Sequence, residues 1–178
     1  MRTRLNAKAR NWLVVGGLML LMSMASVSYV QAQGLSEDEV YWLTYMREEE
    51  KLARDVYLSL GTMWGSRIFT NIAASEQTHM DAIRKLLEKY LIDDPAKGNG
   101  LGIFTEESGL QTVYDDFIAR GTGSLEEALS VGVEIEKKDI DDLKAGIATS
   151  THKDIKTVYG NLLEGSLRHL ASFNSQLQ

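Results

Sequence analysis

The feature that most limits the fold of this chain is its single proline. Pro95 is the only one among 178 residues, so no other position carries the ring that breaks a helix from within. No stretch has the alternating apolar pattern and flanking turns of a β-hairpin. We therefore predict an all-α fold with four long helices: from a cap at Ser36 to Gly61, over Ile68–Tyr90, from a cap at Ser124 to Ile147, and from Ser150–Asp154 to Leu177.

Capping residues and connection lengths refine this prediction. The pairs Ser36 with Glu39 and Ser124 with Glu127 have the spacing of capping boxes, and Ser150 or Thr151 can cap the last helix. Short connections at Thr62–Ser66 and Ala148–Thr151 predict two antiparallel helix pairs. The middle connection, Leu91–Gly123, is about 30 residues long and contains a predicted short helix, Leu110–Arg120. One long crossover between two helix pairs is the ferritin-like connectivity of a four-helix bundle.

Residues 1–32 have the features of an export signal. Four basic residues precede the apolar stretch Leu13–Met22, and the small residues Val30 and Ala32 frame a cleavage site before Gln33. An uncleaved membrane anchor is the alternative, because apolar character continues weakly to Val30. We expect one domain, residues 33–178, that is periplasmic or secreted, or membrane-anchored if the signal is retained.

Charge and cysteine content exclude several classes of function. Loss of the signal would leave 15 Lys and Arg against 25 Asp and Glu, a net charge of −10. A body this acidic is a poor binder of nucleic acid. The chain has no cysteine, so it can hold no disulfide and no thiolate-ligated metal. Any metal site must be built from carboxylates and imidazoles.

An E-x-x-H pair lies on the apolar stripe of the Ile68–Tyr90 helix. Heptad spacing gives Ile72, Glu76, His79, Ile83 and Leu87, so the carboxylate and the imidazole point inward. An unpaired ionised carboxylate is costly to bury. Glu76 therefore requires a partner, and a metal ion is one candidate.

Each other long helix also places a ligand-type residue on its inward stripe. Glu50 lies on the first helix, Glu136 on the third and His169 on the fourth. Asp139 borders the stripe one turn after Glu136, and Ser166 lies one turn before His169. We expect the remaining mid-helix acids on solvated faces: Glu48, Glu49, Glu134 and Glu164.

Two interpretations of the inward polar residues remain open. In one they bind metal; in the other they satisfy one another, and the protein is a metal-free helical interaction module. A lone inward histidine is more often a hydrogen-bonded core residue than a ligand, but the coincidence in four helices favours a metal centre. Without metal, the crowded carboxylates should raise the pKa of some of them above about 4.3.

Longer strings resemble known proteins. The segment from Glu48 to Tyr57, followed by Ser75–Ala82, resembles the first two helices of the bacterioferritin and rubrerythrin families of the ferritin-like diiron-carboxylate superfamily. With Ile135–Leu143 and Gly165–Leu170, these strings resemble a bacterial ferritin-like family of unknown function. The resemblance covers nearly all of residues 36–175 and implies a ferritin-like bundle.

The resemblance also implies roles for individual residues. Glu50 and Glu136 correspond to terminal carboxylate ligands, and Glu76 to a carboxylate that bridges two metals. His79 and His169 correspond to one imidazole on each metal. The sequence departs from the pattern in its last helix, where Ser166 stands in place of a carboxylate; Asp139 or a solvent-derived bridge could compensate. Tyr57 corresponds to a hydrogen-bond donor behind the ligands, with a packed core tyrosine as the alternative.

Ligand type and resemblance together define the expected function. Carboxylates with a few imidazoles suit iron, here as two ions, with manganese as the alternative. The implied activity is that of an exported oxidase, either a ferroxidase or a peroxide-reducing enzyme that uses dioxygen or peroxide. Without cysteine there is no attached rubredoxin, so turnover requires an external electron donor or ferrous iron itself. Non-catalytic iron or manganese sequestration is the alternative, and the oligomeric state stays open, with a homo-oligomer among the options.

Overall fold

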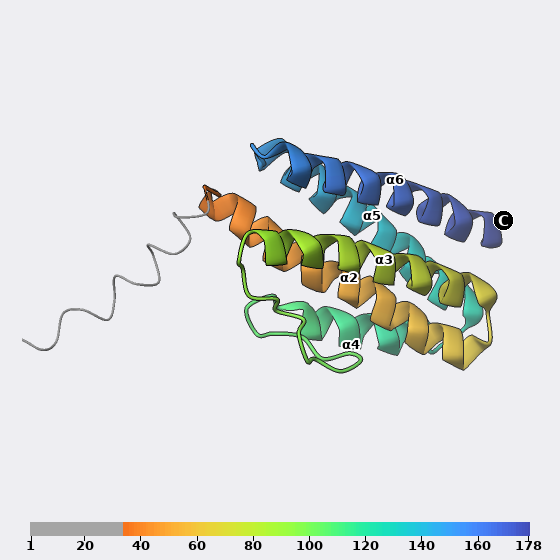
Figure 1. Ribbon diagram of the computed structural model, residues 1–178. Helices are drawn as coiled ribbons and strands as arrows, with labels where there is room; N and C mark the ends of the chain where they lie inside the picture. Colours follow the sequence, from red (N-terminus) through yellow and green to blue (C-terminus); the bar gives the residue numbers. More distant parts are fainter. Residues whose placement is uncertain (1–33) are drawn as a thin grey trace, which may run out of the picture.

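The computed structural model describes residues 34–178, and these residues are all-helical (Figure 1). No strand occurs within this range, which confirms the predicted fold class. The predicted export signal lies outside the described residues. Between residues 34 and 178, no helix is long and apolar enough to cross a membrane. The helices are α2 (Glu37–Trp64), α3 (Arg67–Lys89), α4 (Leu110–Gly121), α5 (Leu125–Thr149) and α6 (Lys153–Gln176).

The long helices pack as two pairs, α2 with α3 and α5 with α6 (Figure 1). Contacts between α2 and α5 and between α3 and α6 join the pairs into a bundle. The short helix α4 packs beside α2 and α5, on the side of α2 away from α6 (Figure 1). The predicted short helix, the two tight connections and the long crossover are all confirmed.

Helix α2 does not end at Gly61 as expected but continues to Trp64, where Gly65 caps it in the left-handed conformation with φ 62°. Gly61 serves close packing instead. A Cβ at this position would lie 3.1 Å from Cβ of Phe69 and 3.2 Å from Cγ2 of Thr70 on α3. The missing side chain therefore lets the two helices of the first pair approach each other closely.

The helix caps agree with the sequence in part. Ser36 and Glu39 form the complete capping box of α2. Ser124 caps α5 by accepting a hydrogen bond from the backbone N–H of Glu127. The predicted cap of α6 is wrong, because His152 is its N-cap residue rather than Ser150 or Thr151.

Glu39 explains why α6 begins differently. Its carboxylate, 1% exposed, accepts hydrogen bonds from the backbone N–H groups of Thr151 at 2.7 Å and His152 at 3.0 Å. His152 Nδ1 lies 2.8 Å from the same oxygen. A side chain from the first turn of α2 therefore satisfies the donors before α6. Burial would raise the pKa of Glu39, but these bonds and that from Ser36 lower it to about 2.

The crossover covers a face of α2 that would otherwise be solvated. Glu48 was expected to be exposed, but it is 2% exposed and accepts hydrogen bonds from the backbone and hydroxyl of Thr105. Lys51 is fully buried and donates to Asp55 at 2.5 Å and to the carbonyl of Gly100 at 2.7 Å. The expectation failed because a distant loop supplies backbone and hydroxyl groups that pair with these charged side chains.

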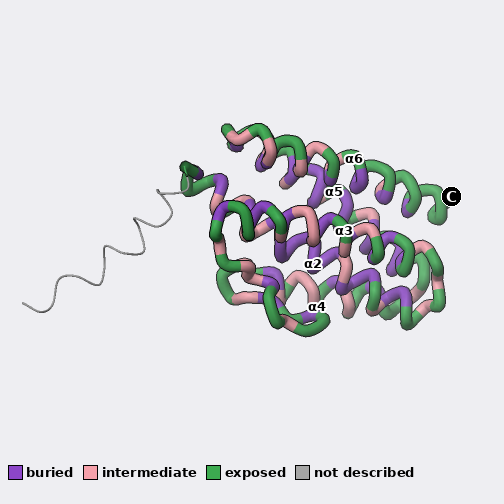
Figure 2. The backbone as a smooth tube through the Cα atoms, viewed as in Figure 1, coloured by how far each residue is buried: buried purple, intermediate pink, exposed green. Residues whose placement is uncertain are grey.

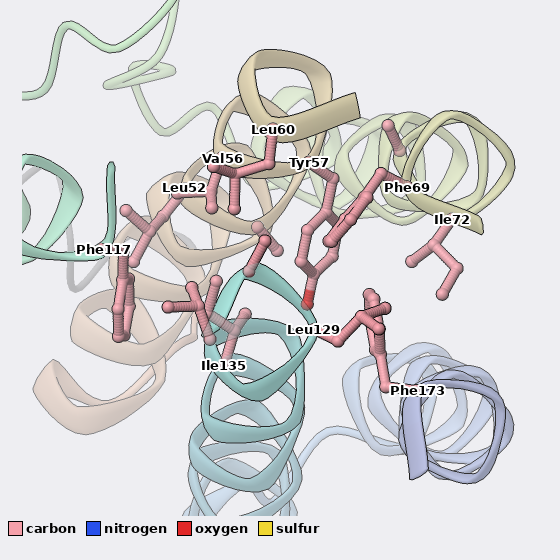
Figure 3. Packing of buried hydrophobic residues seen from close by; sticks show 14 of the residues in the cluster. Leu52, Val56, Tyr57, Leu60, Phe69, Ile72, Phe117, Leu129, Ile135 and Phe173 are labelled. Carbon is pink, nitrogen blue, oxygen red and sulfur yellow. The ribbon is translucent and has the colours of Figure 1, made fainter. Parts of the chain in front are cut away.

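Two apolar clusters flank a polar layer in the middle of the bundle. One cluster includes Leu52, Tyr57, Phe69 and Phe173 (Figure 3). The other cluster, on the opposite side of the polar layer, includes Leu43, Ile83 and Leu162. The buried faces of the helices line the interior along their lengths (Figure 2). The polar layer between the clusters contains the residues that the sequence marks as ligands.

The contacts of Glu39 predict a pH-dependent stability. Its folded pKa of about 2 lies below the usual glutamate value of 4.5, so its contribution to stability is complete above pH 4.5 and is lost as pH falls toward 2. Glu39→Gln should lower the free energy of unfolding by about 1–3 kcal/mol at pH 7, the cost of disrupting a buried acceptor. The difference from wild type should shrink below pH 4.5. Urea denaturation at pH 7, 4 and 3 measures it, with the exposed Glu37→Gln as control; a difference that does not change with pH would contradict it.

Candidate metal centre

Five side chains from four helices meet in the polar layer. Glu50 comes from α2, Glu76 and His79 from α3, Glu136 from α5 and His169 from α6. The three carboxylates are 1–2% exposed, and the imidazoles are 8% and 9% exposed. The inward phase predicted for each of these residues is therefore correct.

The five residues form two overlapping groups that share Glu76. In one, ligand atoms of Glu50, Glu76 and His79 lie within 4.8 Å of one another; in the other, those of Glu76, Glu136 and His169 do. Glu76 uses a different oxygen for each histidine: Oε2 lies 2.7 Å from Nδ1 of His79, and Oε1 lies 2.7 Å from Nδ1 of His169. The shared carboxylate thus has the arrangement of a ligand between two metal positions.

Each imidazole directs Nδ1 toward the carboxylates. A different residue lies beside Nε2 of each ring. Nε2 of His169 lies 3.0 Å from the hydroxyl of Ser75. Nε2 of His79 faces Gly165, where a Cβ would lie only 2.5 Å away. Sequence reasoning missed both roles, although Ser75 directly precedes Glu76 and Gly165 lies one turn before His169. The two rings stack with centroids 5.5 Å apart.

Tyr57 is both a hydrogen-bond donor and a packed core residue. Its hydroxyl donates to Oε1 of Glu136 at 2.7 Å. Its ring packs against those of Phe69 and Phe173, with centroids 6.1 and 5.2 Å away. Figure 3 shows the hydroxyl directed toward α5. Tyr57 therefore holds one oxygen of Glu136 and closes one side of the polar layer with apolar rings.

Asp139 and Ser166 are buried together at the edge of the centre. The hydroxyl of Ser166 donates to Oδ2 of Asp139 at 2.5 Å, and the two residues are 0% and 5% exposed, respectively. Ser166 is on α6 at the position where the ferritin-like pattern has a carboxylate, and Asp139 approaches from α5.

The centre contains buried polar atoms that residues 34–178 do not satisfy. They include Oε1 of Glu50, Oε1 of Glu76, Oδ1 of Asp139 and Nδ1 of His169. Two of these atoms, Nδ1 of His169 and Oε1 of Glu76, lie 2.7 Å apart but are not aligned as a hydrogen bond. Buried polar atoms are normally paired. The unpaired atoms of Glu50, Glu76 and His169 belong to the two groups of ligand atoms, and carboxylate oxygens and imidazole nitrogens of this kind fit a metal ion.

The pKa values reflect this crowding. Burial, with the charge of Glu76 as a further cause, raises the pKa of Glu136 to about 7. Burial also raises the pKa of Glu50. The expectation that crowding raises the pKa of some carboxylates therefore holds for Glu50 and Glu136. Glu76 is the exception: burial alone would raise its pKa, but contacts with His169 and His79 lower it to about 2. Although burial opposes their charged forms, the carboxylates raise the pKa of His79 to about 11 and of His169 to about 9.

Glu49 was expected on a solvated face, and this expectation is wrong. The residue is 3% exposed, and its Oε1 accepts a hydrogen bond from Lys138 at 2.5 Å. The same ammonium group donates to the hydroxyl of Tyr45 at 2.6 Å. A long side chain from α5 therefore covers a carboxylate of α2. Glu134 and Glu164 are exposed, as predicted.

The position of Gly165 predicts a specific steric cost. Gly165→Ala should lower the free energy of unfolding by about 1–3 kcal/mol, as overpacking does, because the new Cβ would press on His79. In a His79→Ala background this cost should disappear. Gly160→Ala, on the same helix, is the control: its Cβ would meet no described atom within 4 Å, so it should stabilise by up to about 1 kcal/mol. Urea denaturation at pH 7 measures all four variants; an equal cost in both backgrounds would refute the role of Gly165.

Comparisons with known proteins give a family but no reaction. The model of a family described as an uncharacterized protein domain, DUF2202, matches residues 39–178. The uncharacterized protein MJ0754 of Methanocaldococcus jannaschii is 48% identical over 147 residues, which cover 83% of this chain and 79% of that protein. The crystal structure of hypothetical protein MJ0754 from Methanococcus jannaschii matches with a TM-score of 0.78 at 48% identity and covers 80% of this chain and 81% of that one. Since the family model spans most of the sequence, the chain belongs to the DUF2202 family.

Proposed function

We propose that this protein is a ferritin-like metal-binding protein that holds two iron ions, with manganese as the alternative. Glu76 carries the proposal, because each of its oxygens faces a different histidine and the residue belongs to two groups that have different second carboxylates. Glu50 and His79 would complete the first metal position, and Glu136 and His169 the second. The order of the helices, two pairs joined by one long crossover, supports the ferritin-like assignment.

The donor set determines which metals suit the site. Carboxylate oxygens and imidazole nitrogens favour iron or manganese over soft metals. The unsatisfied ligand-type atoms of Glu50, Glu76 and His169 provide the capacity to bind, and their burial excludes bulk water from the ligands. Tyr57 donates a hydrogen bond to Glu136, and Nε2 of His169 hydrogen-bonds with the hydroxyl of Ser75; both contacts orient the ligands, as supporting groups do in metal sites.

We further propose that the bound metals perform an oxidase reaction. A pair of ferrous ions can supply two electrons to dioxygen or peroxide, which are therefore the expected co-substrates. The chain has no cysteine, so electrons for turnover come from an external donor or from ferrous iron itself. A periplasmic or secreted location remains a prediction from residues 1–32, and N-terminal sequencing of the mature protein checks it.

Specific observations favour each alternative function. Ser166 stands where a carboxylate is expected, which favours a binding or sequestration protein that lacks oxidase activity. The close contacts of Glu76 with both histidines favour a self-satisfied polar core in a metal-free interaction module. The unpaired buried oxygens of Glu50 and Asp139 within residues 34–178 argue against the second alternative.

Anaerobic titration with ferrous iron tests the proposal. The wild-type protein should bind two equivalents and oxidise them rapidly when air or hydrogen peroxide is added. Glu76→Ala should abolish stoichiometric binding, because it removes the carboxylate shared by both positions. Glu164→Ala is the matched control, since Glu164 is exposed on α6. Two equivalents without oxidation would favour sequestration, and no binding would refute the metal centre.

Thermal stability separates the metal centre from a self-satisfied core. A thousandfold excess of metal over its Kd adds about 4 kcal/mol to the stability of the native state, which raises the Tm by about 10 °C for a domain of this size. Without metal, Glu76→Gln should lower the Tm, because it weakens the contacts with His79 and His169. The same variant should abolish the metal-induced rise. Scanning calorimetry with and without Mn²⁺ measures both; a Tm that no divalent metal changes would contradict the proposal.

A further inference from the structure

The ligand inventory of a diiron bundle is complete in this chain, but it is distributed differently among the helices. The usual set has one Glu on each of two helices and an E-x-x-H motif on each of the other two. Here α2 provides Glu50, and α3 provides Glu76 and His79. The last two helices carry Glu136-x-x-Asp139 and Ser166-x-x-His169. The total is still four carboxylates and two imidazoles, with the fourth carboxylate on α5 instead of α6.

The geometry of Asp139 fits a ligand held in place by α6. Its Oδ2 accepts the hydrogen bond from Ser166 at 2.5 Å, and its Oδ1 has no hydrogen-bond partner among residues 34–178. Asp139 lies on α5 one turn after Glu136, outside the two groups of ligand atoms that lie within 4.8 Å of one another. Ser166 thus occupies the position of the missing carboxylate and holds a carboxylate that comes from another helix.

Charge balance supports the same assignment. Burying an ionised carboxylate without a partner is costly, and Asp139 is only 5% exposed. Four carboxylates balance the charge of two divalent cations when both histidines bind in their neutral form. If Asp139 took no part, three carboxylates would leave the loaded centre with one excess positive charge, and Oδ1 of Asp139 would keep no partner among residues 34–178.

We propose that Asp139 is a metal ligand of this centre, that it replaces the carboxylate missing from the Ser166-x-x-His169 motif, and that Ser166 positions it. The inference rests on the proposed two-metal function. It assigns the centre a ligand from α5 that the usual pattern does not have. It also makes Ser166 a positioning residue, because it reaches the metal only through Asp139.

Relocation of the carboxylate is the sharpest test. Mn²⁺ is titrated into the protein by calorimetry, and electron paramagnetic resonance records the exchange coupling between two bound ions. Wild type should bind two coupled ions. Asp139→Asn should weaken the second equivalent by at least about 100-fold, and Ser166→Ala by about 10–100-fold, the range for loss of a supporting hydrogen bond. Asp139→Ala combined with Ser166→Glu returns the carboxylate to α6 and should restore two coupled ions. Asp141→Asn, an exposed position on α5, is the control.

The outcomes distinguish this inference from the proposed function. If wild type does not bind two ions, the two-metal function itself fails. If wild type binds two coupled ions and Asp139→Asn binds them equally well, the function stands and the role of Asp139 is refuted. Should Asp139→Asn fail to fold, Ser166→Ala decides: an unchanged affinity for the second ion overturns the proposal. Loss in Asp139→Asn together with recovery in the relocated variant supports it.

Discussion

The rest of the structure depends on how the bundle stabilises charged groups in its interior. Glu76 lies between two imidazoles at 2.7 Å from each, and two further carboxylates complete the groups around it. Desolvated charges of this kind are tolerated only with partners supplied at close range. Each of the four long helices contributes at least one of these partners, so none of them can rotate or shift along its axis without leaving a charge unpaired. The polar layer therefore determines the register in which the helices pack.

Apolar packing and the polar layer perform different tasks. The cluster around Tyr57, Phe69 and Phe173 and the cluster around Leu43 and Ile83 provide area-dependent stability that tolerates small changes of shape. The polar layer determines how the helices are positioned relative to one another. Gly165 shows how the two combine: a single absent Cβ on α6 leaves room for the ring of His79, and no apolar contact could substitute for that space.

Much of the fold and the centre was predictable because helical periodicity reports which face a residue occupies. Glu50, Glu76, His79, Glu136 and His169 are all inward for that reason. The burial of Glu48 and Glu49 was not predictable, because their partners, Thr105 and Lys138, are far away in the sequence. The lowered pKa of Glu76 escaped prediction for a related reason: local spacing does not show that two histidines from different helices approach opposite oxygens of one carboxylate.

The crossover has a consequence for how this family can vary. Connecting loops usually tolerate shortening and exchange. Here the segment between α3 and α5 supplies the carbonyl of Gly100 to Lys51 and the backbone N–H of Gly102 to Asp55. A deletion in this segment would expose the buried side chains of Lys51 and Asp55 to solvent, so the loop is part of the packed structure of the domain. We therefore expect relatives that shorten this segment to have other residues at the positions of Lys51 and Asp55.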